Sequence, residues 1–178
     1  MHGQKIALLG LNHTDFKLDL KKATDQITAL HDQGYQVIPF IHWGAEYQHQ
    51  PTTEQIKFAH AFVDAGAFAV VGMHPHVVES VEIYNHAPIF YSLGNTIFDQ
   101  NFSQDTQEGL TLAMEISPEK LSIILLPIRI ERSQPRLMTP AERTDFLVNK
   151  LATWWRYDDQ EIKAQIEKGK IVINLAKN

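Results

Sequence analysis

The sequence predicts an α/β fold (α+β-like in its second half), in which a mixed β-sheet is flanked by helices. In the first half of the chain, short β-branched apolar runs alternate with segments of helical periodicity, a pattern typical of β-α-β units. In the second half, two longer apolar runs separated by a turn indicate an antiparallel hairpin, and polar helical segments follow them. With 178 residues, 44% of them hydrophobic, the chain is long enough to bury the core of one domain. We therefore expect a single domain over 1–178, with its core in 5–132 and a C-terminal helical extension in 140–178.

The first elements in order are a buried strand over 5–11, a helix over 19–33 and a second strand over 35–41. The apolar residues of 19–33 recur at helical spacing, and Gly34 supplies the stop signal. Pro39 lies inside the second strand and has no N–H to donate, so an edge position or a bulge is expected there.

A second helix is expected to begin after Thr52, which forms a capping-box pattern with Gln55, and to end at Gly66. Short strands should follow over 67–71, 77–84 and 88–93, with a turn at 85–87. The polar segment 101–108 is expected to be a loop. The remaining elements are a hairpin of 109–116 and 121–132, helices over 140–155 and 158–168, and a strand over 171–175.

Composition excludes several classes of protein. The net charge of −5 and the lack of a basic stripe argue against nucleic acid as a partner. Because the chain has no cysteine, disulfides and thiolate metal sites are excluded, and histidine and carboxylate remain as strong metal ligands. The longest apolar run, 121–128, is too short to cross a bilayer, and the first residues have no signal-peptide pattern.

Three histidines follow two predicted strands of the first half. His42 comes directly after 35–41, and His74 and His76 follow 67–71. The carboxyl ends of neighbouring parallel strands share one edge of a sheet, where ligands collect. Pro75 favours an extended backbone for His74, the residue before it. In extended backbone the side chains of residues i and i+2 point to the same side, so His74 and His76 are expected to point the same way.

Gly72 is expected to let the chain turn off its strand. The pattern therefore predicts a site for zinc, manganese or iron, although packed or surface histidines would be the default from spacing alone. The other six histidines are expected at the surface or in loops.

Three segments in register resemble the CapA family, over roughly 5–132. They are His42-Trp43-Gly44-x-Glu46-Tyr47, Gly72-x-His74-Pro75-His76-Val77, and Tyr91-Ser92-Leu93-Gly94-Asn95 with Phe98-Asp99. The family comprises bacterial proteins of poly-γ-glutamate capsule synthesis and belongs to the calcineurin-like metallophosphoesterase superfamily. The resemblance implies a four-layer αββα sandwich with two divalent metal ions between its sheets. It further implies that His42 and His74 bind one ion (Mn, Zn or Fe) and that His76 binds its neighbour.

The chain also departs from the family pattern. Family members begin with an N-terminal half that carries an Asp after its first strand, an Asn-x-Glu segment and an Asn-Asn-His segment, and this chain lacks that half with its three motifs. The chain therefore resembles only the C-terminal half, and no catalytic acid is assigned in it. Met73 stands where a histidine is common, and Thr96 stands where an aromatic residue is usual. Two metal ions require more carboxylates than this segment offers, so little activity is expected from it alone.

Other residues near these segments have two interpretations each. Glu46 and Asp99 either orient an imidazole or a loop on the substrate side, or lie plainly on the surface. Asn95 either forms a hydrogen bond near the metal or is a simple turn residue. Glu79 is expected on the surface and Trp43 in the core. The pair Trp154-Trp155 is expected to cover either the sheet or the surface left bare by the missing half.

Three functions are compatible with these patterns. The first is a metal-dependent phosphoesterase of capsule biosynthesis, completed by the N-terminal half and acting on a phosphate ester or serving an anionic polymer. The second is a non-catalytic component of a capsule-polymer assembly complex that binds partner proteins or the polymer. The third is an inactive fragment whose bare sheet would drive self-association into homo-oligomers. The family resemblance places the protein at the cell surface, outside the cytoplasm.

Overall fold

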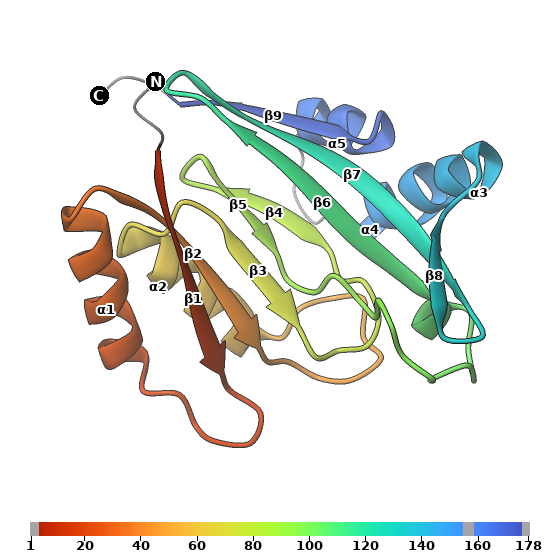
Figure 1. Cartoon of the computed structure of the whole chain (residues 1–178), viewed down its shortest axis with the longest axis horizontal. Coiled ribbons are helices and arrows are strands. Elements are labelled where there is room, and N and C mark those ends of the chain that lie inside the picture. The colour runs from red at the N-terminus through yellow and green to blue at the C-terminus, as the bar shows by residue number, and fades with distance from the viewer. Residues whose placement is uncertain (1–3, 155–158, 176–178) are drawn as a thin grey trace.

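The strands of the protein form two sheets, as the computed structural model shows for residues 4–154 and 159–175 (Figure 1). The first sheet has the order β1-β2-β3-β5-β4, and the second has β6-β7-β8 with β9 also paired to β7. The strands of the first sheet are β1 (Lys5–Asn12), β2 (Tyr35–His42), β3 (Val70–Met73), β4 (Val81–Tyr84) and β5 (Ala87–Phe90). Those of the second are β6 (Glu108–Ile116), β7 (Lys120–Glu131), β8 (Gln134–Leu137) and β9 (Lys170–Asn174). The α/β prediction is confirmed.

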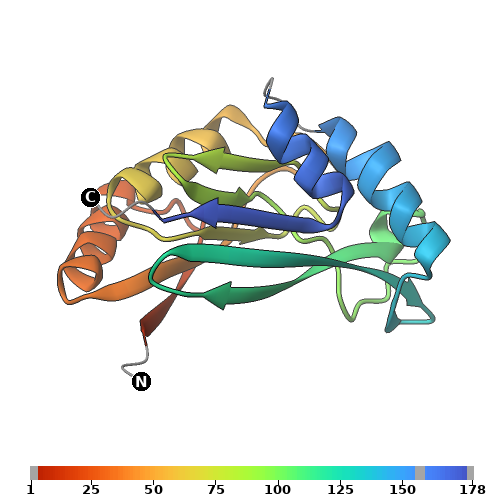
Figure 2. The same ribbon diagram turned by 90° about the horizontal axis from the view of Figure 1, so that it is seen from above.

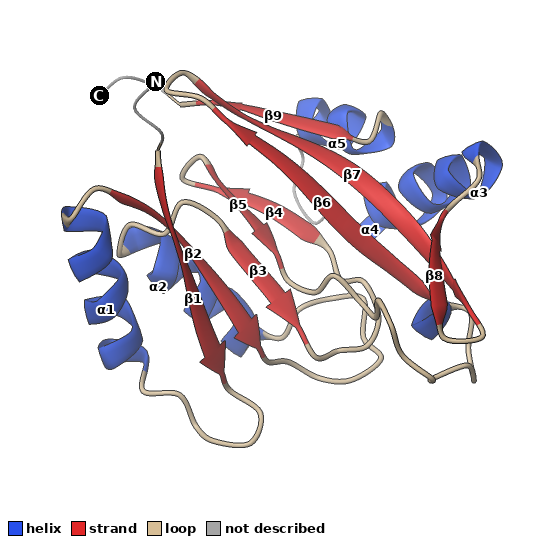
Figure 3. Cartoon of the chain, in the orientation of Figure 1, coloured by secondary structure: helices blue, strands red, loops and turns tan. Residues whose placement is uncertain are grey.

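The first sheet is mixed. The pairs β1–β2, β2–β3 and β3–β5 are parallel, and only β4 runs antiparallel to its neighbour β5. Helices α1 (Leu20–Asp32) and α2 (Thr53–Asp64) connect the parallel strands and pack on one face of this sheet. The predicted capping box of Thr52 and Gln55 is present at the start of α2. These short β-α-β connections bring the carboxyl ends of β1, β2 and β3 to one edge (Figure 3).

The second sheet is antiparallel throughout. Its apolar face packs on a core shared with β4, β5 and the C-terminal helices. Figure 2 shows the arrangement of these strands and helices from above. The predicted helix over 140–155 is divided into α3 (Pro140–Thr144), a π-helical turn (Asp145–Leu151) and α4 (Ala152–Trp154). Helix α5 (Gln160–Glu167) corresponds to the predicted helix over 158–168, and Trp155 and Asp158 lie outside the described residues. Within the described residues, no helix is both long and apolar enough to span a membrane.

Several local predictions were wrong. The strand predicted over 67–71 begins three residues later, and 77–80 is a loop with one bridge between Val78 and Leu93. The strand β8 was not predicted, because it follows a tight turn of Arg132 and Ser133, both at positive φ, rather than a typical glycine turn.

Pro39 does not lie in an edge strand, because β2 is paired on both sides. A bulge does accompany it. Val37 pairs with Ala67 and Phe40 with Val71, so the offset between partners grows from 30 to 31 across Pro39. The extra residue on the β3 side interrupts the ladder where the proline has no N–H to donate.

Candidate metal centre

The histidine cluster lies at the carboxyl edge of the first sheet. His42 is the last residue of β2 and pairs in register with Met73, the last residue of β3. His74 follows directly, so the parallel register of two neighbouring strands brings these two histidines side by side. A hydrogen bond of 2.8 Å, from the Tyr47 N–H to the Pro75 carbonyl, connects the loop after β2 with the loop after β3.

The imidazole nitrogens of the cluster approach one another closely. His74 Nδ1 lies 3.1 Å from His42 Nε2, and the two ring centroids are 4.6 Å apart. The ligating atoms of Glu46, His74 and His76 all lie within 4.8 Å of one another. Two nitrogens on one tetrahedral zinc ion, each about 2.1 Å from it, would be about 3.4 Å apart. The spacing of these nitrogens and of the Glu46 carboxylate is therefore that of a metal-ligand set.

The backbone that delivers His74 and His76 is not extended, contrary to prediction. Their φ angles are 104° and 62°, and Tyr47 in the facing loop has a φ of 61°. Positive φ is unfavourable for residues with a side chain, and it is most unusual for a residue that precedes proline. Such strain persists only where the surrounding structure enforces it, and it is typical of functional sites. The rings converge through this strained turn and not through strand alternation.

Gly72 has a different role from the one predicted. It lies within β3, where a side chain would collide with the Tyr91 carbonyl and the Trp43 indole. The Trp43 indole N–H donates to that same carbonyl at 2.9 Å, and its ring is only 1% exposed. Trp43 is therefore a core residue, as expected, and Gly72 allows its close approach to the strand.

Asn95 fixes the orientation of the His76 ring. Its amide nitrogen donates to the Thr106 carbonyl at 3.0 Å, which leaves the amide oxygen 3.0 Å from His76 Nδ1. His76 Nδ1 must then carry the proton, so that Nε2, 3.7 Å from the Glu46 carboxylate, presents its lone pair. The side chain of Asp99 is exposed and is not among the converging ligand atoms of the described residues.

Burial favours the neutral form of His74 by lowering its pKa. Its pKa is lowered chiefly by loss of solvent and further by the neighbouring His42 and His76, while Glu46 and Asp15 act in the opposite direction. A neutral imidazole is the form that coordinates a cation.

Glu79 is not on the surface, contrary to prediction. It is 1% exposed, and its Oε2 accepts a hydrogen bond from the Gln55 side chain at 2.8 Å. Its other carboxylate oxygen has no hydrogen-bond partner among the described residues. Burial therefore raises the pKa of Glu79 to about 8. The Gln55 side chain also accepts a hydrogen bond from the Thr52 N–H in the capping box of α2, so Glu79 lies beside the start of this helix.

Sequence reasoning missed a second set of contacts beside the cluster. His49, expected at the surface or in a loop, lies in the loop after β2 and stacks on Trp154 with ring centroids 4.0 Å apart. Its two nitrogens face the Val78 carbonyl at 2.8 Å and the Asp105 carboxylate at 3.2 Å. The loop that carries Glu46 is thus held against the C-terminal helices. No local pattern indicates this, because Trp154 and Asp105 are far from His49 in the sequence.

Comparison with known proteins identifies relatives of this chain. Residues 3–100, more than half of the chain, match the family described as "Bacterial capsule synthesis protein PGA_cap". The "Capsule biosynthesis protein CapA" of Bacillus anthracis is 35% identical over 71% of this chain and 33% of its own length. The "PGA biosynthesis protein CapA" of Bacillus subtilis is 34% identical over 78% of this chain and 36% of its own length. A "probable polyglutamine synthesis accessory protein" of Mycobacterium tuberculosis is 28% identical over 67% of this chain. The chain spans about a third of the length of each Bacillus relative that it matches.

Proposed function

Because the chain belongs to the PGA_cap family of bacterial capsule synthesis proteins, we propose that it holds a divalent transition-metal ion between His42, Glu46, His74 and His76. We further propose that the whole protein uses this ion to hydrolyse a phosphate ester at the cell surface. The observation that carries the proposal is the convergence of Glu46, His74 and His76 at the edge of the sheet, with His42 beside His74. His74 and His76 reach this position on a strained turn.

The donor set fits a transition metal better than calcium or magnesium. Imidazole nitrogen suits zinc, manganese and iron, whereas calcium and magnesium prefer an all-oxygen shell. Glu46 would supply the one negative charge among the four ligands. Asn95 would hold the His76 ring with Nε2 toward the ion, and the lowered pKa of His74 would favour the neutral, metal-binding imidazole.

The same donor set suits one ion better than two. A pair of divalent ions needs several carboxylates to offset four positive charges, and Glu46 is the only carboxylate in the converging group of described residues. We propose that hydrolysis requires further carboxylates in addition to these ligands, and that this chain alone turns over slowly. A bound ion would lower the pKa of a coordinated water and polarise a phosphoryl oxygen.

The charges around the cluster favour a small phosphate ester over an anionic polymer as the ligand. The segments 43–50, 74–80 and 91–107 contain no lysine or arginine. They do contain the carboxylates of Glu46, Glu79, Asp99 and Asp105. A polyanion would therefore meet no positive side chain on these segments, whereas one phosphate could bind through the ion.

Calorimetric titration of the metal-free chain with Mn²⁺ and Zn²⁺ tests the proposal. We expect about one ion per chain, and a loss of at least tenfold in affinity for His74→Ala. His31→Ala is the matched control, since His31 is an exposed histidine of α1 and should leave binding unchanged. A bis-aryl phosphate assay with Mn²⁺ should show slow turnover.

Two results would contradict this account. Fast turnover that His74→Ala abolishes would mean that no further carboxylates are needed. The absence of metal binding would favour a non-catalytic component of a capsule-polymer assembly complex.

A further inference from the structure

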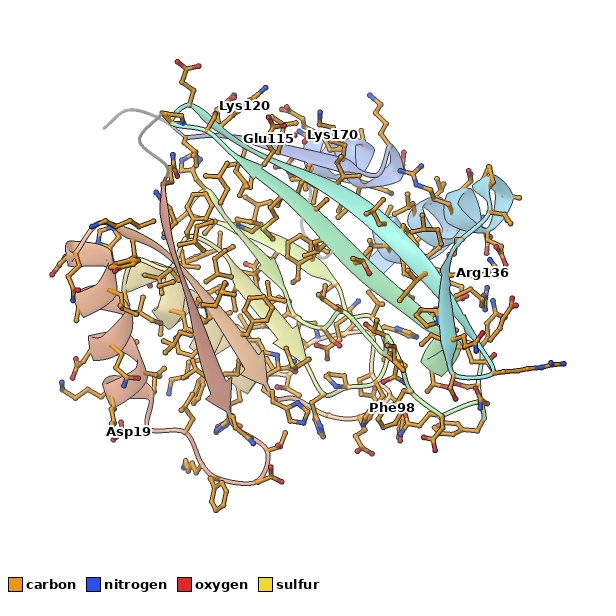
Figure 4. The ribbon with its side chains drawn as sticks, in the orientation of Figure 1. Asp19, Phe98, Glu115, Lys120, Arg136 and Lys170 are labelled. Carbon is orange, nitrogen blue, oxygen red and sulfur yellow. The ribbon has the colours of Figure 1, made fainter. Side chains whose placement is uncertain are left out.

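Exposed apolar side chains gather around the histidine cluster. Of the ten exposed large hydrophobic residues in the described part of the chain, five lie on loops at the carboxyl edge of the first sheet. They are Phe16, Tyr47, Ile97, Phe98 and Phe102. Figure 4, where Phe98 is labelled, shows the side chains at this lower edge of the molecule. Exposed apolar side chains that cluster at one site indicate a binding surface, whereas single exposed ones scattered over a protein are normal.

Three of these rings are linked to a proposed metal ligand. Tyr47 stacks on His76 at 5.9 Å between centroids and 26° between planes, and Phe98 lies 5.2 Å from His76 at 33°. Phe102 packs edge-on against Tyr47 at 5.4 Å. All three remain open to solvent, with exposed fractions of 41%, 42% and 67% for Tyr47, Phe98 and Phe102. The rings are thus held in place on one side and free on the other.

The position of these rings suggests what they contact. A phosphate on an ion held by His76 would place its ester group within reach of Tyr47 and Phe98. The only charged groups on the same loops are carboxylates, so an anionic ester group would be repelled. The apolar cavity of about 390 Å³ between the sheets, lined in part by Phe40 and Met114, includes none of the three rings. An ester group bound next to the ion would therefore meet exposed aromatic faces, on which a flat ring stacks, and not the lining of that cavity.

We propose that Tyr47, Phe98 and Phe102 bind the alcohol part of the phosphate ester, and that this part carries a flat ring next to the phosphate. The inference rests on the proposed metal site. It adds a surface, formed by these three rings, that would select among phosphate esters. The surface would contribute to affinity by stacking against a ring of the ester. Each such contact corresponds to a factor of about 2 to 10 in affinity.

Non-hydrolysable phosphonates separate this inference from the metal site itself. We would titrate the Mn²⁺-loaded chain with phenylphosphonate, hexylphosphonate and methylphosphonate. Phenylphosphonate should bind most tightly. Phe98→Ala and Phe102→Ala should each weaken phenylphosphonate about 2- to 10-fold and leave methylphosphonate unchanged. Leu137→Ala, an exposed apolar residue of β8, is the matched control and should change neither affinity.

The outcomes distinguish the two proposals. Bound Mn²⁺ with equal affinities for phenyl- and methylphosphonate would overturn the ring surface and leave the metal site intact. Equal affinities for phenyl- and hexylphosphonate would show a general apolar surface and would also overturn ring recognition. A chain that binds no Mn²⁺ would overturn both proposals. Within the described residues, Phe102 has a ring contact with Tyr47 and none with His76, so a loss in Phe102→Ala separates ring binding from damage to the metal ligand His76.

Discussion

Asn95 is the residue on which the orientation of the His76 ring depends. We expect Asn95→Leu to leave the fold intact but to lower the affinity for Mn²⁺ about 10- to 100-fold, since the tautomer and angle of the ring are no longer fixed. Calorimetry on the variant measures this. Asn101→Ala, an exposed position in the same loop region, is the control. Unchanged affinity in Asn95→Leu would mean that His76 is oriented by other contacts.

Glu79 makes stability depend on pH. Its pKa in the folded protein is about 8, above the ordinary value of 4.5, so the folded state binds the proton more tightly than the unfolded state does. The free energy of unfolding should then fall as pH rises from about 4.5 to about 8, by up to about 1.4 kcal/mol per pH unit. Above pH 8, this contribution should be fully lost.

Glu79→Gln should remove this pH dependence, because the amide has the shape of the acid without its charge. We expect the variant to match the native protein near pH 5 and to be more stable at pH 9. Urea denaturation at both pH values measures the difference. An identical loss of stability between pH 5 and 9 in both proteins would show that Glu79 is not the responsible group.

At the scale of the element, β3 tolerates no side chain at Gly72. We expect Gly72→Ala to destabilise the protein by several kcal/mol, because its methyl group would collide with the Tyr91 carbonyl and break the bond from Trp43. Gly10→Ala in β1 is the matched control, since no atom of the residues that the structure describes lies within 4 Å of a Cβ added there. Thermal unfolding of the two variants should differ clearly, and equal melting temperatures would contradict this packing.

The helices and strands show which parts of the fold could be predicted from the sequence. Apolar runs and the Thr52 cap signal predicted β1, β2, α1 and α2 to within two residues, because these signals are local. The parallel pairing of two neighbouring strands also allowed us to predict that His42 and His74 lie together at the carboxyl ends of those strands. The left-handed turn at His74 and His76 could not be predicted, because Pro75 ordinarily favours the opposite backbone conformation. The burial of Glu79 and the contact of His49 with Trp154 depend on tertiary packing, which has no local signal.

At the scale of the whole molecule, the outer edge of β1 is unpaired among the described residues. Leu8, 68% exposed, and Ile6, 50% exposed, lie on the face of this strand that α1 and α2 do not cover. Exposed apolar edge strands promote association. We expect the chain to self-associate with rising concentration, and Leu8→Lys to reduce this. Light scattering after size exclusion measures it, and a strict monomer at all concentrations would contradict the expectation.

The central claim is that one divalent ion binds between His42, Glu46, His74 and His76. Anomalous diffraction from crystals grown with Mn²⁺ or Zn²⁺ tests it most directly. We predict one strong anomalous peak about 2.0 to 2.3 Å from His42 Nε2, His74 Nδ1 and His76 Nε2, with a Glu46 oxygen completing the shell. A crystal of the metal-loaded protein with no peak among these side chains, or with its peak elsewhere, would contradict the account.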